Sequence, residues 1–294
     1  MTYESFFGFN ENPFGVTPDP RFFFSSQSHR DALAYLRYTL GEHKGFAAVI
    51  GEVGVGKTTV VKKFVETLTG RVDAAVVLNP NLSFKQFLTT VAREFGLSVK
   101  GKSKAELLID LEEFLSEAGR AERSVILIID EAQNLPAASL EEIRMLSNIE
   151  SESKKLLQIA LVGQPELGEV LSLKSLRQLR QRIPGLCVIS PLSRGEVEEY
   201  VRSRLLRAGA QGESVFARDA IDEIYGYSGG IPRKINFVCD RALLLGFVDD
   251  VKIIGKNYIC TAEADLEGRK CPGAGADSDI QAAEGLSEAG RSAA

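Results

Sequence analysis

Short apolar runs alternate with amphipathic segments along the first two thirds of the chain. Five runs have the composition of strands buried on both faces of a parallel sheet; they lie at 45–50, 74–78, 124–129, 156–162 and 186–189. Between them, apolar residues three or four positions apart predict helices; these lie at 29–40, 60–68, 83–95, 104–118, 139–148 and 173–183. The alternation predicts an α/β domain at 29–191, with a parallel five-stranded sheet flanked by helices.

The pattern changes on both sides of this domain. From 192 to 267 it predicts helices only, and therefore a small α-helical domain; these helices lie at 193–208, 217–226, 233–247 and 256–266. Gly, Ala, Ser and acidic residues dominate 268–294, which predicts a disordered tail because such a segment cannot bury a core. Prolines and scattered aromatic residues in 1–28 predict an extended segment packed on the core, and not a helix.

A glycine-rich loop separates the first predicted strand from the helix that follows it. Its sequence is Gly51-Glu52-Val53-Gly54-Val55-Gly56-Lys57-Thr58-Thr59. Glycines allow backbone N–H groups to turn toward phosphates, and a helix N-terminus adds a partial positive charge. We expect Lys57 to reach the β- and γ-phosphates and the Thr58 hydroxyl to ligate Mg²⁺. The loop therefore predicts binding of a nucleoside triphosphate.

Two adjacent carboxylates, Asp130 and Glu131, directly follow the apolar run at 124–129. In a parallel sheet this position lies at the carboxyl edge, where ligands bind. Asp130 is suited to hold Mg²⁺ through water, and Glu131 to accept a proton from the attacking water. Gln164 follows the next predicted strand and is suited to sense the γ-phosphate or to orient the water. An ordinary strand-to-helix turn is the alternative interpretation of Gln164.

Other basic side chains are candidates whose alternatives the sequence leaves open. Arg177, Arg180 and Arg182 either form a solvated helix face or reach the γ-phosphate held by a neighbouring subunit. Arg233 begins a predicted helix, from which it could reach back to the phosphates or remain solvated. His29 begins another, where it could touch the nucleotide base or be a surface histidine near a helix cap.

Composition narrows the class of protein. The net charge of −5 gives no general attraction to nucleic acid, although a local basic patch is compatible with it. The four cysteines form no C-x-x-C pair and there are two histidines, so we expect no zinc site. There is no signal-peptide pattern and no apolar run of the roughly 18 residues that a membrane span needs. We therefore expect a soluble, cytoplasmic protein.

Taken together, these motifs resemble the AAA+ ATPases over about residues 3–266. The loop resembles a Walker A motif, 125–131 a Walker B motif, and Gln164 lies in the sensor-one place. Arg182 falls in the arginine-finger region, and Arg233 ends a sequence similar to sensor two, Gly230-Ile231-Pro232-Arg233. The resemblance implies a P-loop NTPase fold with a helical lid and Mg²⁺-dependent hydrolysis of ATP to ADP and phosphate. It also implies a nucleotide-dependent homo-oligomer, such as a ring, in which Arg182 faces the ATP of the next subunit.

Shorter motifs resemble the general secretion pathway protein A (ExeA-like) group. They are Asn12-Pro13-Phe14 with Thr17-Pro18-Asp19-Pro20-Arg21-Phe22, His29-Arg30-Asp31-Ala32-Leu33, and Leu161-Val162-Gly163-Gln164-Pro165-Glu166-Leu167. Within this group the resemblance is closest to secretion ATPases of exosortase (XrtA)/PEP-CTERM exopolysaccharide loci. ExeA-type proteins continue into a membrane helix and a peptidoglycan-binding domain, so the polar end of this chain favours the short type or a pilus-biogenesis relative.

The resemblance implies an ATPase that energises or regulates envelope secretion or exopolysaccharide assembly of a PEP-CTERM, type II secretion or pilus-like kind. Its partner would be a component of that system, and the partner would bring the chain to the inner membrane as a peripheral protein. The alternative is a DNA-binding ATPase adaptor of the TniB, TnsC and MuB transposition type, which shares this core. The net charge of −5 and the lack of a recognisable helix-turn-helix weigh against nucleic acid as a partner.

Overall fold

The computed structural model describes residues 2–269, except 16, 18, 79, 81, 151–153, 212 and 213. The chain divides into two compact units. The α/β unit is residues 17–192, and the helical unit combines residues 1–16 with the chain from 193 onward. The tail predicted at 268–294 lies, from residue 270, outside the described residues.

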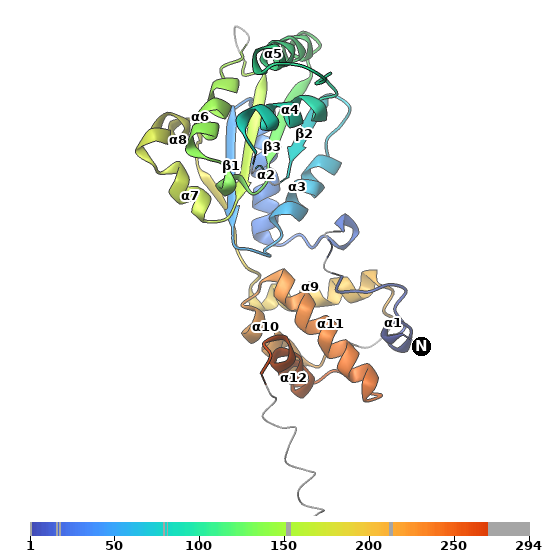
Figure 1. Ribbon diagram of the computed structural model, residues 1–294. Helices are drawn as coiled ribbons and strands as arrows, with labels where there is room; N and C mark the ends of the chain where they lie inside the picture. Colours follow the sequence, from blue (N-terminus) through green and yellow to red (C-terminus); the bar gives the residue numbers. More distant parts are fainter. Residues whose placement is uncertain are drawn as a thin grey trace, which may run out of the picture. The chain divides into compact units, whose positions relative to one another are not determined.

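A parallel five-stranded sheet forms the centre of the α/β unit, as the sequence predicts (Figure 1). The strand order is β2-β3-β4-β1-β5. The strands are β1 Phe46–Gly51, β2 Val72–Val77, β3 Ser124–Ile129, β4 Leu157–Gly163 and β5 Leu186–Ile189. Strand β4 therefore lies between β1 and β3, and Ile50 at the end of β1 is opposite Gly163 at the end of β4.

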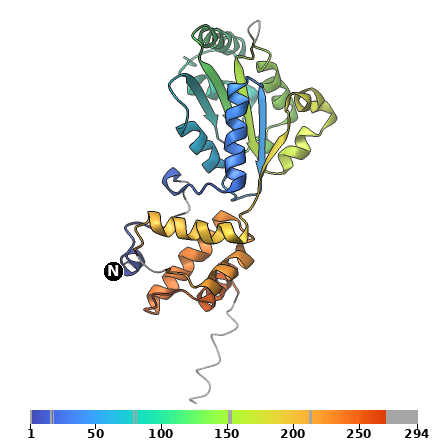
Figure 2. The ribbon, with the colours of Figure 1, turned by 180° about the vertical axis from the view of Figure 1, so that it is seen from behind.

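Helices cover both faces of the sheet. Figure 2 shows α2 (Gln27–Gly41) across one face, which α3 (Lys57–Glu66) also covers. The opposite face carries α4 (Phe84–Glu94), α5 (Lys104–Arg120), α6 (Ala137–Leu146), α7 (Glu166–Leu171) and α8 (Arg177–Arg182). Alternate residues of β3 face the two layers, with Ile126 and Ile128 packed toward α2 and α3 and Leu127 toward the other helices. This two-sided burial explains the continuous apolar composition of the strands.

Gln158 is the polar exception within buried β4, and its exposed fraction is 0%. Its carbonyl oxygen accepts the N–H of Gly45 at 2.8 Å, and its amide donates to the carbonyl oxygen of Lys155 at 2.8 Å. A buried amide with both ends bonded avoids the cost of an unsatisfied polar group. Gln158 thus fixes the chain before β1 to the start of β4.

The helical unit consists of α1 (Tyr3–Phe7), α9 (Arg194–Arg207), α10 (Arg218–Ser228), α11 (Pro232–Val248) and α12 (Lys256–Leu266). Its N-terminal part differs from our expectation of extended backbone through residue 28, because residues 3–7 form a helix. The reason is local packing: the Phe6 ring meets Phe247 of α11 edge-on, with 5.4 Å between the ring centroids.

Residues 13–15 are anchored to α9 inside the helical unit. Phe14 is 1% exposed and meets the ring of Phe216 at 6.0 Å. The buried guanidinium of Arg204 donates to the carbonyl oxygens of Pro13 at 2.5 Å and Gly15 at 3.3 Å. The N-terminal segment therefore contributes to the core of the helical unit.

Two helix boundaries in the α/β unit also differ from the predicted ones. Helix α6 begins at Ala137, after Pro136, and Ser139 lies buried inside its first turn instead of capping it. The helix predicted at 173–183 forms as a 3-10 turn, Lys174–Leu176, followed by α8. The break allows Leu176 and Leu179, both 0% exposed, to enter the same core. No helix in the described part of the chain is long and apolar enough to cross a membrane.

We predict that Phe14→Ala destabilises the helical unit by about 3–5 kcal/mol, the usual cost of truncating a buried phenylalanine. Denaturant unfolding of the full chain, followed by circular dichroism, measures the change. Phe14→Leu is the matched control and should retain most of the stability, because it fills most of the same volume. A loss below about 1 kcal/mol for the alanine variant would contradict the anchoring role of Phe14.

Candidate functional site

The predicted site residues of the α/β unit follow three neighbouring strands. The glycine-rich loop begins at the end of β1, Asp130 follows β3, and Gln164 follows β4, which lies between them. All three strands are parallel, so their carboxyl ends form one edge. The structure therefore brings the loop, the carboxylates and Gln164 together at this edge.

The loop needs its glycines for conformation and for space. Gly54 and Gly56 have φ of 86° and 101°, in the left-handed region that other residues rarely adopt. A Cβ on Gly51 would lie 2.7 Å from the carbonyl oxygen of Ile189. The remaining loop residues are placed as follows: Glu52 and Val53 are exposed, Val55 is buried, and Thr59 is half-buried in the first turn of α3.

Lys57 is the first residue of α3 and is 6% exposed. Its ammonium donates to the carbonyl oxygens of Gly51 at 2.7 Å and Glu52 at 3.0 Å. Burial lowers the pKa of Lys57, and the charges of Glu131 and Asp130 partly oppose that shift. The loop thus holds the ammonium over its own carbonyl oxygens, which the oxygens of a phosphate could replace.

Thr58 and Asp130 form a pair suited to a divalent cation. The Thr58 hydroxyl donates to Oδ2 of Asp130 at 2.6 Å, and Asp130 is 2% exposed. Burial raises the pKa of Asp130, while the hydrogen bond from Thr58 opposes the rise. A hydroxyl and a carboxylate supply the hard oxygen ligands that Mg²⁺ prefers. The donor set therefore fits the magnesium predicted from the sequence.

Glu131 begins the turn after β3 in a left-handed conformation, with φ of 54° and ψ of 37°. Its Oε2 accepts hydrogen bonds from two side-chain amides, Gln133 at 2.6 Å and Gln164 at 3.0 Å. Burial by itself raises the pKa of Glu131, but the two amides and the charge of Lys57 outweigh it, and the pKa lies below its ordinary value. The carboxylate is therefore held ionised and oriented, as a base for water requires.

Gln133 is a site residue that none of the sequence motifs indicates. Besides its bond to Glu131, its carbonyl oxygen accepts the backbone N–H of Gln164 at 3.1 Å. Space for this side chain depends on Gly163, because a Cβ there would lie 2.6 Å from the Gln133 oxygen. The sequence does show an amide side chain two residues after Glu131. Its contact with the carboxylate can be inferred only when the conformation of the turn is known.

His29 is buried, with 5% of its surface exposed, and is not the surface histidine of the alternative interpretation. Its ring nitrogens lie 3.0 Å from the carbonyl oxygen of Phe24 and 2.8 Å from that of Val55. Val55 belongs to the glycine-rich loop, so His29 links the start of α2 to that loop. Contact with a nucleotide base stays a prediction.

The candidate arginines have different surroundings. Arg182 donates to the Ser147 hydroxyl at 2.6 Å, and Arg180 donates to the carbonyl oxygen of Ile183 at 3.0 Å. Arg177 is exposed and forms no ion pair or side-chain hydrogen bond with other described residues. Arg233 belongs to the helical unit, where its guanidinium lies exposed, 5.7 Å from the centroid of the Phe237 ring. Phosphate contacts by these side chains stay predictions.

Comparisons with known proteins agree with this arrangement. An AAA domain family model matches residues 39–171. General secretion pathway protein A of Aeromonas hydrophila is 40% identical over 268 residues, which are 90% of this chain and 49% of that protein. The chain thus spans about half the length of this relative.

Solved structures with the same fold come from more distant proteins. The ORC2 protein of Aeropyrum pernix, in ADPNP–ADP complexes, aligns with a TM-score of 0.65 at 17% identity, over 87% of this chain and 72% of that one. CDC6P from Pyrobaculum aerophilum aligns with a TM-score of 0.66 at 19% identity, over 90% of this chain and 71% of that one. At these identities the likeness concerns the fold.

We predict that Gln133→Met lowers the turnover of bound ATP by roughly 10- to 100-fold, because a base that is no longer held in place attacks less efficiently. Loss of one hydrogen bond to the carboxylate should also raise the pKa of Glu131 and move the acid limb of the kcat–pH profile to higher pH. Phosphate release at saturating MgATP across pH measures both effects.

The neighbouring residue provides the control for this variant. Asn134 is an exposed amide in the same turn, and its side chain has no hydrogen-bond partner among the described residues. Asn134→Ala should therefore leave turnover and its pH profile unchanged. If Gln133→Met kept the wild-type acid limb, Gln133 would have only a structural role.

Proposed function

We propose that this chain, an AAA+ protein of the general secretion pathway protein A (ExeA-like) group, hydrolyses ATP to ADP and phosphate. This hydrolysis energises or regulates envelope secretion or exopolysaccharide assembly. The identity of 40% to general secretion pathway protein A supports this class of process. The relative is about twice as long, so the assignment concerns the ATPase region. The partner would be a component of the envelope assembly system, which would bring this cytoplasmic chain to the inner membrane as a peripheral protein.

The observation that carries the hydrolytic role is the position of Glu131. The side-chain amides of Gln133 and Gln164 both donate to Oε2 of Glu131, which leaves Oε1 of Glu131 as the acceptor for a proton from water. A protein that only binds nucleotide has no need of a carboxylate held ionised at this edge. Gln164 is bonded to that carboxylate and lies at the end of the adjacent strand, where it is suited to detect the γ-phosphate.

The other residues bind and orient the substrate in this proposal. The backbone N–H groups of 51–56 and the ammonium of Lys57 contact the phosphates, and the N-terminus of α3 adds its partial positive charge. Thr58 and Asp130 hold Mg²⁺, which when bound neutralises charge on the phosphate oxygens. His29 fixes the loop through its contact with Val55 and supports the base side of the nucleotide.

We propose that the site becomes complete only at the interface between two subunits of a homo-oligomer. Arg182 is the proposed finger for the ATP of a neighbouring subunit, and Arg233 contributes to phosphate binding as in a sensor-two motif. Arg182 is bonded to Ser147 within its own chain, so this role requires exchange of that bond for a phosphate oxygen. Arg177, exposed on the same helix, is the direct alternative and is tested alongside.

Phosphate release by mixed variants tests this proposal. Glu131→Gln lacks the base and Arg182→Ala lacks the finger, so each alone should turn over roughly 10³-fold more slowly than the wild type. A mixture should regain activity, because subunits that keep Glu131 receive Arg182 from their neighbours. Specific activity of the wild type should rise with protein concentration for the same reason.

The same assay distinguishes Arg182 from Arg177 as the finger, and the secretion ATPase from the DNA-binding adaptor. If Arg177→Ala complements Glu131→Gln and Arg182→Ala does not, Arg177 is the finger. Duplex DNA should leave the rate unchanged. A strong DNA stimulation that falls steeply with salt would instead favour the transposition-adaptor class, because phosphate contacts release counterions.

A further inference from the structure

Both ring nitrogens of His29 face backbone carbonyl oxygens, although the residue is buried inside the α/β unit. The exposed fraction of His29 is 5%. Its Nδ1 lies 3.0 Å from the carbonyl oxygen of Phe24, and its Nε2 lies 2.8 Å from that of Val55. The Phe23 ring lies beside the imidazole, with 5.6 Å between the ring centroids. The histidine therefore joins the segment before α2 to the glycine-rich loop.

These two carbonyl oxygens determine which protonation state of the ring fits. A carbonyl oxygen accepts hydrogen bonds and donates none. Neutral imidazole has a single N–H, so one nitrogen would direct its lone pair at a carbonyl oxygen. The imidazolium has an N–H on each nitrogen and satisfies both contacts, which matters because an unsatisfied buried polar group is costly. The geometry of His29 therefore indicates the doubly protonated, cationic ring.

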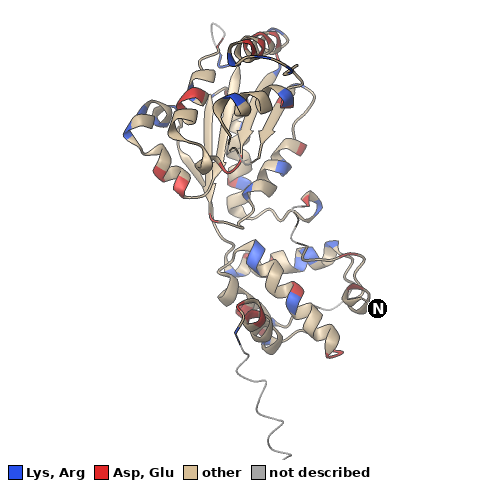
Figure 3. Ribbon diagram, viewed as in Figure 1, with Lys and Arg blue, Asp and Glu red and all other residues tan. Residues whose placement is uncertain are grey.

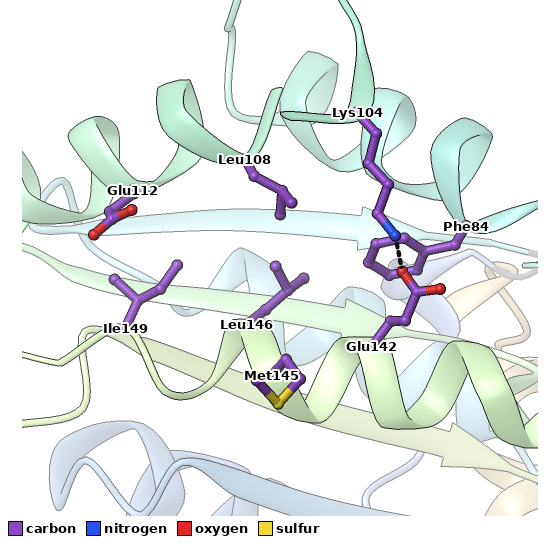
Figure 4. A pocket seen from close by; sticks show the side chains of 8 residues that line it. All are labelled: Phe84, Lys104, Leu108, Glu112, Glu142, Met145, Leu146 and Ile149. Carbon is purple, nitrogen blue, oxygen red and sulfur yellow. Dashed lines mark hydrogen bonds and ion pairs between the residues drawn. The ribbon is translucent and has the colours of Figure 1, made fainter. Parts of the chain in front are cut away.

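A cation held by carbonyl oxygens keeps its net charge, unlike one held by a carboxylate. In the pocket between α5 and α6, Figure 4 shows Lys104 pointing to Glu142, whose carboxylate cancels its charge in an ion pair. At the glycine-rich loop, backbone carbonyl oxygens hold the ammonium of Lys57 and face the ring of His29. A carbonyl oxygen carries only a partial negative charge, so both cations remain able to attract an anion.

The charged groups on the elements around the ring are equal in number for each sign. They are Asp19 and Arg21 before α2, Arg30 and Asp31 on α2, Glu52 in the loop and Lys57 on α3. Asp19 and Arg21 form an ion pair with each other at 2.6 Å. Arg30 and Lys57 disfavour a further cation, as does burial, whereas Asp31 and Glu52 favour it. Figure 3 shows basic residues on α3 as well. The charge of the ring thus depends on its two carbonyl contacts.

The contact at Val55 also sets the direction of a peptide group in the loop. Val55 lies between Gly54 and Gly56, whose φ angles of 86° and 101° are left-handed. In a trans peptide the C=O and the N–H point in opposite directions, so a carbonyl oxygen turned toward His29 directs the N–H of Gly56 away from it. A Cβ on Gly56 would lie 3.1 Å from Nε2, so the ring packs directly against this peptide.

We propose that His29 is an imidazolium cation that positions the glycine-rich loop, and that loss of its proton weakens nucleotide binding. The inference rests on the nucleotide binding of the proposed function, in which N–H groups of the loop contact phosphates, and adds a pH-dependent positioning residue to it. When the proton leaves, one carbonyl contact becomes repulsive, and the ring separates from Phe24 or from Val55. A positive charge at the loop is lost in the same step.

Nitrogen NMR of the full chain with ¹⁵N-labelled histidine tests the charge directly. The chain contains two histidines, His29 and His43, and His43→Asn assigns their signals. His43 has φ of 49°, a conformation that asparagine tolerates. Both nitrogens of His29 should carry a proton at about pH 7.5, where an ordinary histidine, with a pKa of about 6.5, is mostly neutral. One protonated and one bare nitrogen at that pH would overturn the proposal.

Binding of ATPγS with Mg²⁺, measured by calorimetry, tests the consequence for the loop. The affinity of the wild type should fall about tenfold between about pH 6 and about pH 8.5, because the bound anion holds the proton on the ring. His29→Gln offers a neutral amide in place of Nε2, so its affinity should lack this fall and remain near the high-pH value of the wild type. Every variant keeps Lys57, whose own titration therefore cancels in the comparison.

His43→Asn is the matched control and should keep the pH dependence of the wild type, and circular dichroism checks that both variants are folded. The same fall in affinity for His29→Gln and the wild type would overturn the proposal, as would its loss in His43→Asn. Absence of ATPγS binding by the wild type would overturn the proposed function and the role of the ring together. Neither measurement involves hydrolysis, so pH-dependent binding without phosphate release from ATP would contradict only the proposed ATPase activity.

Discussion

The parallel alignment of β3, β4 and β1 is the constraint on which the rest of the site depends. It places the glycine-rich loop, the acidic pair and Gln164 at one edge, with Ile50 opposite Gly163. A shift of β4 by one residue would reverse the faces of its side chains and remove Gly163 from beside Gln133. Burial of the strands on both faces makes such a shift costly, so the core fixes the geometry of the site.

Charge balance is the second condition for the site. Lys57, Asp130 and Glu131 share a partly buried edge, where the charge of Lys57 lowers the pKa of both carboxyl groups and the two carboxylates raise the pKa of Lys57. Burial opposes the charged form of all three, while the opposite charges and the amide hydrogen bonds support it. In the proposed function a bound triphosphate would add negative charge, which the ammonium of Lys57 and the N-terminus of α3 would offset together with Mg²⁺ held by Thr58 and Asp130. Removing one cation from this group would therefore disturb both binding and the basicity of Glu131.

The sequence predicts the parts of the structure that depend on local pattern. The five strands and the loop at 51–59 follow from apolar runs and glycine spacing, and the fold confirms the sheet. The sequence does not predict contacts that depend on the direction of the backbone. One example is the hydrogen bond from Gln133 to Glu131, which requires the left-handed conformation of Glu131. Nor does the sequence show which residues a buried aromatic side chain packs against. The position of Phe14 in the core of the helical unit is therefore known only from the structure.

Whether Glu131 is the base that activates water is tested most directly by phosphate release from Glu131→Gln compared with the wild type, with ATP binding measured on the same preparations. We predict that the variant binds MgATP with wild-type affinity, because the loop and Lys57 are intact, but releases phosphate roughly 10²- to 10⁴-fold more slowly. Equal phosphate release by both proteins would contradict the assignment of Glu131 as the base and, with it, the hydrolytic role of this edge.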